Sequence, residues 1–162
     1  MKSVYPATWL LLLFISWGDS SELKPEDMHD CYFKLLCPLN NIEEFQRLGE
    51  ECGDEIKEKG WGLIKTVTGV EGTENTIENW ARYRSTVCEF SEKETRKQFN
   101  EFFQLGGEYW LEVCVNAFSE RCKKAVKASE IIAEMFERHF ANGDCEKIDE
   151  TDSKKNKKIV YG

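Results

Sequence analysis

The chain has 162 residues, of which 30 are Asp or Glu and 22 are Lys or Arg, so its formal net charge at pH 7 is −8. Nucleic-acid binding needs clustered positive charge on the protein, so this acidic balance disfavours a nucleic-acid partner. The length suits one domain with a core of its own.

Residues 1–20 have the pattern of a secretory signal peptide. Lys2 gives a positive start, an apolar run covers residues 7–15, and the small residues Ser16, Gly18 and Ser20 follow at spacings that signal peptidase accepts. The apolar run is too short to cross a bilayer, which takes about 20 residues. We therefore expect a secreted, extracellular protein without a membrane span.

All seven cysteines follow the signal peptide, and an exported chain folds in an oxidising compartment, so most of them should form disulfides. The odd number leaves one thiol that is free or links two chains into a disulfide-bonded dimer. The sequence has no C-x-x-C pair and only two histidines, so we expect no metal and no cofactor. The disulfide candidates are Cys31, Cys37, Cys52, Cys88, Cys114, Cys122 and Cys145.

The first predicted helix begins at Pro25, which suits the first helical position, and is closed by Pro38. A second begins after Asn41, which has capping-box spacing to Glu44, and ends at residues 60–62, where two glycines flank Trp61. Residues 63–70 fit either a short helix or a strand. No other strand is predicted, so we interpret them as helix or irregular packing.

A further helix is predicted from Ile77 to about Phe90. Ser91 and Glu94 have the spacing of a second capping box, and the helix that they begin should stop at residues 106–107, a pair of glycines.

The longest predicted helix runs from Glu108 to Asn142, without an internal Gly or Pro. Phe118 lies at the centre of its apolar face and is predicted to be buried. Cys114 and Cys122 would lie about 12 Å apart in such a helix, too far for a disulfide between them. Apolar or small residues keep one face continuous: Leu111, Val115, Phe118, Cys122, Ala125, Ser129, Ile132, Phe136 and Phe140.

These elements predict an all-α fold, a single disulfide-stapled bundle of about five or six helices packed on one long C-terminal helix. The helical cysteine-rich domain covers residues 21–146, and residues 147–162 form a mobile polar tail whose removal should leave stability unchanged. The tail is either an ordinary soluble end or a segment trimmed at its paired lysines and amidated through Gly162. Cys145, just before the tail, is predicted as the odd thiol, with capture by another cysteine as the alternative.

Two histidines and one aromatic cluster are the remaining candidates. We expect His29 at the surface near a helix start, and His139 packed on an apolar face, with a pH switch as the alternative. Aromatic residues flank the glycine pair at 106–107 and form either core or an apolar pocket for a lipid-like ligand. These aromatic residues are Phe99, Phe102, Phe103, Tyr109 and Trp110.

The sequence contains no recognised catalytic motif, so we expect no catalytic residues and no enzyme. The function expected from export and covalent stapling is a secreted, non-enzymatic binding or effector protein acting on an extracellular macromolecule, in the manner of a venom or salivary component. The alternative is a carrier of a small hydrophobic ligand in a pocket between helices.

Overall fold

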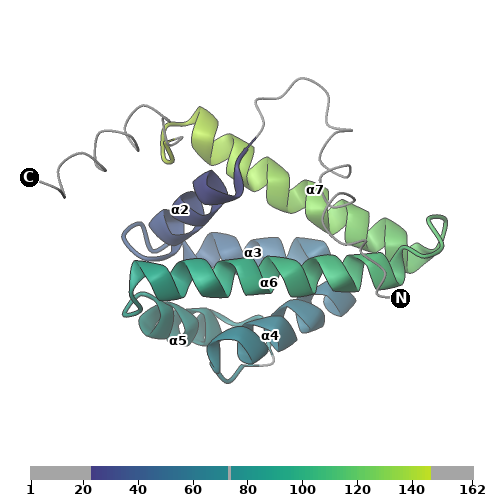
Figure 1. The fold of residues 1–162 in the computed structure, drawn as a ribbon, viewed down its shortest axis with the longest axis horizontal. Coiled ribbons are helices and arrows are strands. Elements are labelled where there is room, and N and C mark those ends of the chain that lie inside the picture. Colours follow the sequence, from purple (N-terminus) through teal and green to yellow (C-terminus); the bar gives the residue numbers. More distant parts are fainter. Residues whose placement is uncertain (1–22, 73, 147–162) are drawn as a thin grey trace, which may run out of the picture.

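The computed structural model describes residues 23–72 and 74–146 (Figure 1). The predicted signal peptide and the predicted tail lie outside the described residues, so neither prediction is tested. Within these ranges the chain forms six α-helices and no strand, which confirms the all-α, disulfide-stapled class. The helices are α2 (Pro25–Leu36), α3 (Ile42–Cys52), α4 (Asp54–Thr68), α5 (Ile77–Val87), α6 (Glu92–Val113) and α7 (Glu120–Ala141).

The helices pack around α3 and α6. Helix α6 lies along α4, whereas α3 contacts α4, α5 and α7. In Figure 1, α6 and α7 diverge from the turn that joins them, and α2 lies at the open end of this hairpin. The N-terminus and C-terminus of α6 therefore mark the two ends of the molecule.

The predicted 35-residue helix from 108 to 142 is wrong. Helix α6 runs through Gly106 and Gly107 to Val113, residues 114–119 form a turn, and α7 begins at Glu120. Ser119 is the N-cap of α7, and its Oγ accepts a hydrogen bond from the Cys122 amide. The apolar spacing continues across this turn, so periodicity alone could not reveal the break.

The predicted burial of Phe118 is also wrong: the residue is 87% exposed, and Val115 is 89% exposed. Both belong to the turn between α6 and α7. The apolar face predicted from Cys122 onward is partly confirmed, because Cys122, Ala125 and Phe136 are buried.

The predicted boundary at residues 60–62 is wrong as well. The break falls at Gly53, whose φ of +82° lies in the region that favours glycine, and α4 continues to Thr68. Trp61 is buried in the core, and the burial of its large ring outweighs the weak helix propensity of its two glycine neighbours. The helical interpretation of residues 63–70 is confirmed as far as Thr68.

The predicted helix starts are mostly confirmed. Pro25 is the first residue of α2, and Ser91 with Glu94 forms a reciprocal capping box at α6. Asn41 is the N-cap of α3, but its side chain makes no capping bond to the backbone and donates to Glu44 Oε2 instead, at 3.4 Å.

The core is centred on Trp80 of α5. Its ring stacks on Phe45 of α3 with 5.4 Å between centroids and meets Trp61 of α4 edge-on at 5.1 Å. Such aromatic pairs stabilise a fold by about 0.5–1.5 kcal/mol beyond the area that they bury. Three helices that are separate in sequence are therefore joined through one indole.

The buried side chain of Asn75 holds the segment that precedes α5 against α3. Its Oδ1 accepts from Trp80 Nε1 at 2.8 Å, and its Nδ2 donates to the backbone oxygen of Gln46 at 2.7 Å and to Glu50 Oε1 at 2.8 Å. A Cβ on Gly49 would lie 2.8 Å from the Asn75 amide atoms. Position 49 is therefore glycine because any larger side chain would clash with the hydrogen-bonded amide of Asn75.

We expect Gly49→Ala to lower the free energy of unfolding by about 1–3 kcal/mol, because the added methyl displaces a hydrogen-bonded buried amide. Gly60 in α4 is the matched control, since nothing lies within 4 Å of an added Cβ there. Gly60→Ala should raise stability by about 0.5–1 kcal/mol through helix propensity. Urea unfolding of the oxidised protein measures both, and equal effects of the two substitutions would contradict the packing described.

A pair of tyrosines joins α2 to α5. The Tyr32 hydroxyl donates to the Tyr83 hydroxyl at 3.1 Å. Burial raises the pKa of Tyr83 from 10.0 to about 12, and burial next to Tyr83 raises the pKa of Tyr32 well above 10.0. A phenol whose pKa is higher in the folded state stabilises the fold below its unfolded pKa and loses that contribution as pH rises through its folded pKa.

Alkaline titration should therefore destabilise the protein between about pH 10 and pH 12. Tyrosinate absorbance and far-ultraviolet circular dichroism, recorded together, should show Tyr32 and Tyr83 ionising only as helical signal is lost. In Tyr83→Phe the free energy of unfolding should fall less steeply with rising pH. Full tyrosine ionisation near pH 10 with an intact helical spectrum would show that the pair is exposed to solvent.

Candidate functional site

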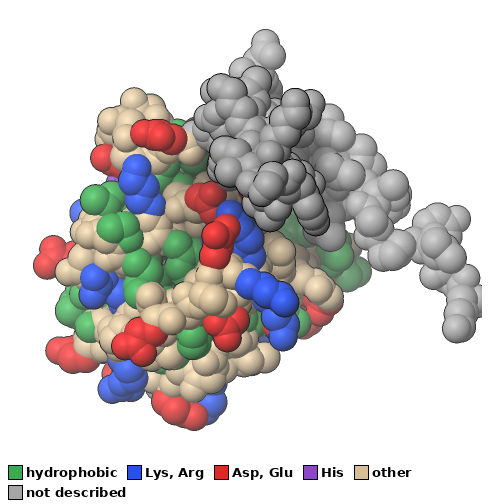
Figure 2. Space-filling view, turned by 60° about the vertical axis from the view of Figure 1, so that its left-hand side comes forward, with side chains coloured by type: hydrophobic (Ala, Val, Ile, Leu, Met, Phe, Trp, Pro, Cys, Tyr) green, Lys and Arg blue, Asp and Glu red, His purple; other side chains and the backbone are tan. Residues whose placement is uncertain are grey.

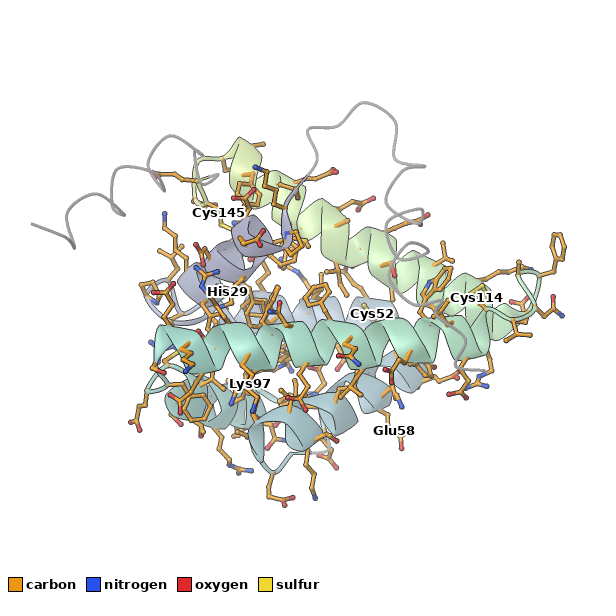
Figure 3. All side chains as sticks on the ribbon, in the orientation of Figure 1. His29, Cys52, Glu58, Lys97, Cys114 and Cys145 are labelled. Carbon is orange, nitrogen blue, oxygen red and sulfur yellow. A yellow bond between two sulfur atoms is a disulfide. The ribbon has the colours of Figure 1, made fainter. Side chains whose placement is uncertain are left out.

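The most conspicuous surface feature is the end of the α6–α7 hairpin, residues 114–122, which we call the α6–α7 tip. It comprises the turn at residues 114–119 and the first residues of α7, with Cys114 as the C-cap of α6 and Cys122 in the first turn of α7. The two form a disulfide with 4.6 Å between their Cα atoms. The prediction that they could not bridge is wrong, because it assumed an unbroken helix. Figure 3 shows Cys114 at the end of the molecule where α6 and α7 meet.

Local hydrogen bonds order the turn inside this disulfide. Asn116 accepts twice, through Oδ1 from the Phe118 amide and through its backbone oxygen from the Ser119 amide, each at 3.0 Å. The Ser119 hydroxyl donates to the Val113 oxygen at 3.2 Å. The tip is therefore a tight turn held at both ends, with few alternative conformations to lose on binding.

Large apolar side chains are exposed on and next to the tip. Val115 and Phe118 are almost fully exposed, and Leu111 in the last turn of α6 is 50% exposed. Burial of a Val, Leu or Phe side chain typically contributes about 1.5–3 kcal/mol of free energy. In the isolated chain the exposed side chains do not make this contribution, but they would if a partner covered them. A cluster of large exposed apolar residues is more informative than a single one, because it marks contact surfaces.

A polar network anchors the base of the tip to α4. Glu55 accepts hydrogen bonds from Arg121 Nε at 2.7 Å and from the Tyr109 hydroxyl at 3.2 Å. The bond from Arg121, and then that from Tyr109, lower the pKa of Glu55. Lys59 Nζ lies 5.0 Å from the centre of the Tyr109 ring. These contacts fix the direction in which the hairpin projects.

The other two disulfides tie the opposite end of the bundle together. Cys31 pairs with Cys145 and Cys37 pairs with Cys88, which confirms that Cys31 and Cys37 do not bond to each other. The prediction of Cys145 as the odd thiol is wrong. The amides of Asp144 and Cys145 both donate to the His139 oxygen, and this turn brings the buried Cys145 back onto α2.

The free thiol belongs to Cys52, which is half-buried at the end of α3. Burial, and secondarily the charge of Glu51, raise the pKa of Cys52 above its usual 9.0. A raised pKa leaves less thiolate at neutral pH, and the thiolate is the reactive form. The predicted dimer through an odd cysteine remains a prediction, now assigned to a thiol of low reactivity.

Both histidines are buried. His29 was expected at the surface, but its Nδ1 lies 2.6 Å from Asp30 Oδ1 and its Nε2 lies 3.1 Å from Thr95 Oγ1, so it joins α2 to α6. His139 packs inward, as predicted, with its Nδ1 and Nε2 each 2.8 Å from a carboxylate oxygen, of Asp144 and Glu44 respectively. A pH switch at His139 remains a prediction.

The five aromatic residues predicted to form a pocket divide into two groups. Phe99 is buried, and its ring lies 4.5 Å from that of Phe103 and 5.4 Å from that of His29. Phe102 contacts Phe103, which is 40% exposed. Tyr109 lies at the base of the tip, and the backbone oxygen of Trp110 accepts from the Cys114 amide.

Two hollows lie elsewhere on the described surface, and none of these five aromatic residues lines either. The larger, about 450 Å³, is bordered by α2, the end of α5 and the start of α6. The smaller, about 60 Å³, lies between α3 and α7. Among residues 23–72 and 74–146, no group of His, Cys, Asp and Glu is arranged to hold a metal ion.

Comparison with known proteins gives no match to a family, a curated protein or a solved structure. None of the helices in the described part of the chain is long and apolar enough to cross a bilayer. Any assignment of function therefore rests on the geometry above.

Proteolytic mapping under non-reducing conditions should recover the pairs Cys31–Cys145, Cys37–Cys88 and Cys114–Cys122. Only Cys52 should react with iodoacetamide, and more slowly at pH 8 than a cysteine in an unstructured peptide, because its raised pKa lowers the thiolate fraction. A peptide linking Cys114 to an earlier segment would contradict the tip structure. Rapid alkylation of Cys52 would contradict its burial.

Proposed function

We propose that this protein is a secreted, non-enzymatic binding or effector protein that contacts an extracellular protein through the α6–α7 tip. The observation that carries the proposal is the nearly complete exposure of Val115 and Phe118 on a turn held by a disulfide. Residues at binding hot spots are typically aromatic anchors on ordered surfaces, which lose little entropy when bound.

Three disulfides support an extracellular setting, since such bonds persist in oxidising compartments and are rare in the cytosol. The signal-peptide pattern of residues 1–20 agrees with this. The proposal of a non-enzymatic role rests on the lack of a recognised catalytic motif in the sequence. A venom or salivary component is one setting for such a protein.

The shape of the tip favours a pocket on the partner over an exposed strand edge. Phe118 lies in a turn whose amides bond to Asn116, so the segment presents a knob and has no extended backbone to add to a sheet. A protein with an apolar pocket is therefore the favoured target.

The carrier alternative has less support. Its five predicted pocket residues line neither of the two hollows described above, and Tyr109 bonds to Glu55 at the base of the tip. A carrier purified from its source would bring an apolar ligand that mass spectrometry of an organic extract detects.

The test is a binding screen of the oxidised protein against purified extracellular domains, comparing wild type with Phe118→Ser. We expect a domain whose affinity falls at least about 30-fold in the variant, the effect of losing a hot-spot residue. Because Phe118 is exposed, the variant should keep its circular dichroism and melting temperature.

The matched control is Leu39→Ser, which changes an exposed apolar residue, 45% exposed, in the loop between α2 and α3. Binding should be unaffected by this substitution. Replacement of both Cys114 and Cys122 by Ser should weaken binding by freeing the tip. A screen without binders, or with binders that respond equally to Phe118→Ser and Leu39→Ser, would overturn the proposal.

A further inference from the structure

The hollow at the start of α6 has the size of a small-molecule site and lies at the opposite end of α6 from the tip. Its volume is about 450 Å³, within the range of about 300–1,000 Å³ that is usual for such sites. Figure 2 turns this end of the molecule forward and shows apolar side chains interleaved with acidic and basic ones. The hollow is open to solvent, so a ligand can enter without movement of a helix.

One wall of the hollow is apolar and covalently fixed. Phe33 of α2, Val87 of α5 and Phe90 line it together with the Cys37–Cys88 disulfide. Arg84 strengthens the junction between the two helices, because its Nε and Nη2 donate to the backbone oxygens of Leu36 and Cys37 at 2.9 and 2.7 Å. This wall is therefore formed before any ligand arrives.

The other wall is polar and carries an excess of negative charge. Arg96 donates from Nη2 to Asp30 Oδ1 and from Nε to Glu92 Oε1, each at 2.9 Å. One guanidinium thus faces two carboxylates. His29 Nδ1 also lies against Asp30 Oδ1, and its Nε2 faces the Thr95 hydroxyl. Asp30, Glu92 and Arg96 together carry a formal charge of −1.

Each carboxylate keeps one oxygen available. Asp30 Oδ2 and Glu92 Oε2 accept no hydrogen bond from the residues that the structure describes. Both carboxylates bond to the same guanidinium through their other oxygens, Asp30 Oδ1 and Glu92 Oε1, and both residues line the hollow. An ammonium has three N–H donors and no acceptor, which matches this pair of acceptors.

We propose that this hollow binds a small primary amine with an aromatic or alkyl body. The ammonium lies between Asp30 and Glu92, and the body packs on Phe33, Phe90 and the disulfide. An aromatic face within about 6 Å of the ammonium adds a cation–π attraction. A carboxylate or phosphate ligand is disfavoured by the two carboxylates, and a wholly apolar ligand would leave their charge uncompensated.

The test is isothermal titration calorimetry of the oxidised protein with phenethylamine at pH 7 and low salt. The paired probe is 3-phenylpropionate, which has a similar body and the opposite charge. We expect a submillimolar dissociation constant for the amine and no measurable binding of the carboxylate. Added salt should weaken the amine complex, because the charges lie near the surface.

Glu92→Gln should weaken phenethylamine binding about fivefold, the effect of losing one partly solvated ion pair. Glu92 is exposed, so the variant should fold normally; Asp30→Asn should weaken binding further where circular dichroism shows an intact fold. Glu101→Gln, an exposed carboxylate on the same helix, is the control and should bind as wild type does.

Equal binding of phenethylamine and 3-phenylpropionate, or an unchanged affinity in Glu92→Gln, would overturn the proposal. So would the absence of heat up to millimolar amine. None of these results depends on the extracellular partner of the α6–α7 tip.

Discussion

The disulfide between Cys114 and Cys122 is the constraint on which the proposed function depends. It joins the C-cap residue of one 22-residue helix to the first turn of another, with 4.6 Å between Cα atoms. Two cysteines eight residues apart in a continuous helix are about 12 Å apart. The bond is therefore compatible only with a chain that reverses between α6 and α7, and this reversal exposes Phe118.

The opposite end of the bundle is held by two disulfides between segments far apart in the sequence. Cys31–Cys145 and Cys37–Cys88 join α2 to the end of α7 and to the end of α5. Between these covalent ends lies a core in which Trp80 contacts Phe45 and Trp61 and is oriented by Asn75. Long disulfide loops stabilise chiefly by restricting the unfolded chain. The short loop at the tip closes few residues, so its main effect is on local shape.

The sequence predicts the helical class and several helix starts because these depend on local chemistry. Pro25 and the Ser91–Glu94 capping box act within one turn of the chain, and the structure confirms both. Gly53 ends α3, and the sequence alone did not separate it from the glycines around Trp61. The position of the helix break depends on the burial of Trp61 against Trp80, a contact between two different helices.

The candidate site was missed for a related reason. The residues of the tip continue the apolar spacing of a helix, so pattern alone placed Phe118 in the core. The contrary signal was present in Ser119, an N-cap residue three positions before Cys122, together with the eight-residue spacing of the two cysteines. The hollow was also missed, since Asp30, Glu92 and Arg96 converge only when α2 packs against the start of α6.

The most direct test of the account is the backbone conformation between residues 108 and 122 in the oxidised protein. Cα and carbonyl chemical shifts from nuclear magnetic resonance report helix residue by residue. We expect helical shifts up to Val113, non-helical shifts through residues 114–119, and helical shifts again from Glu120. Uninterrupted helical shifts from Glu108 to Asn142 would contradict the hairpin, and with it the exposure of Phe118.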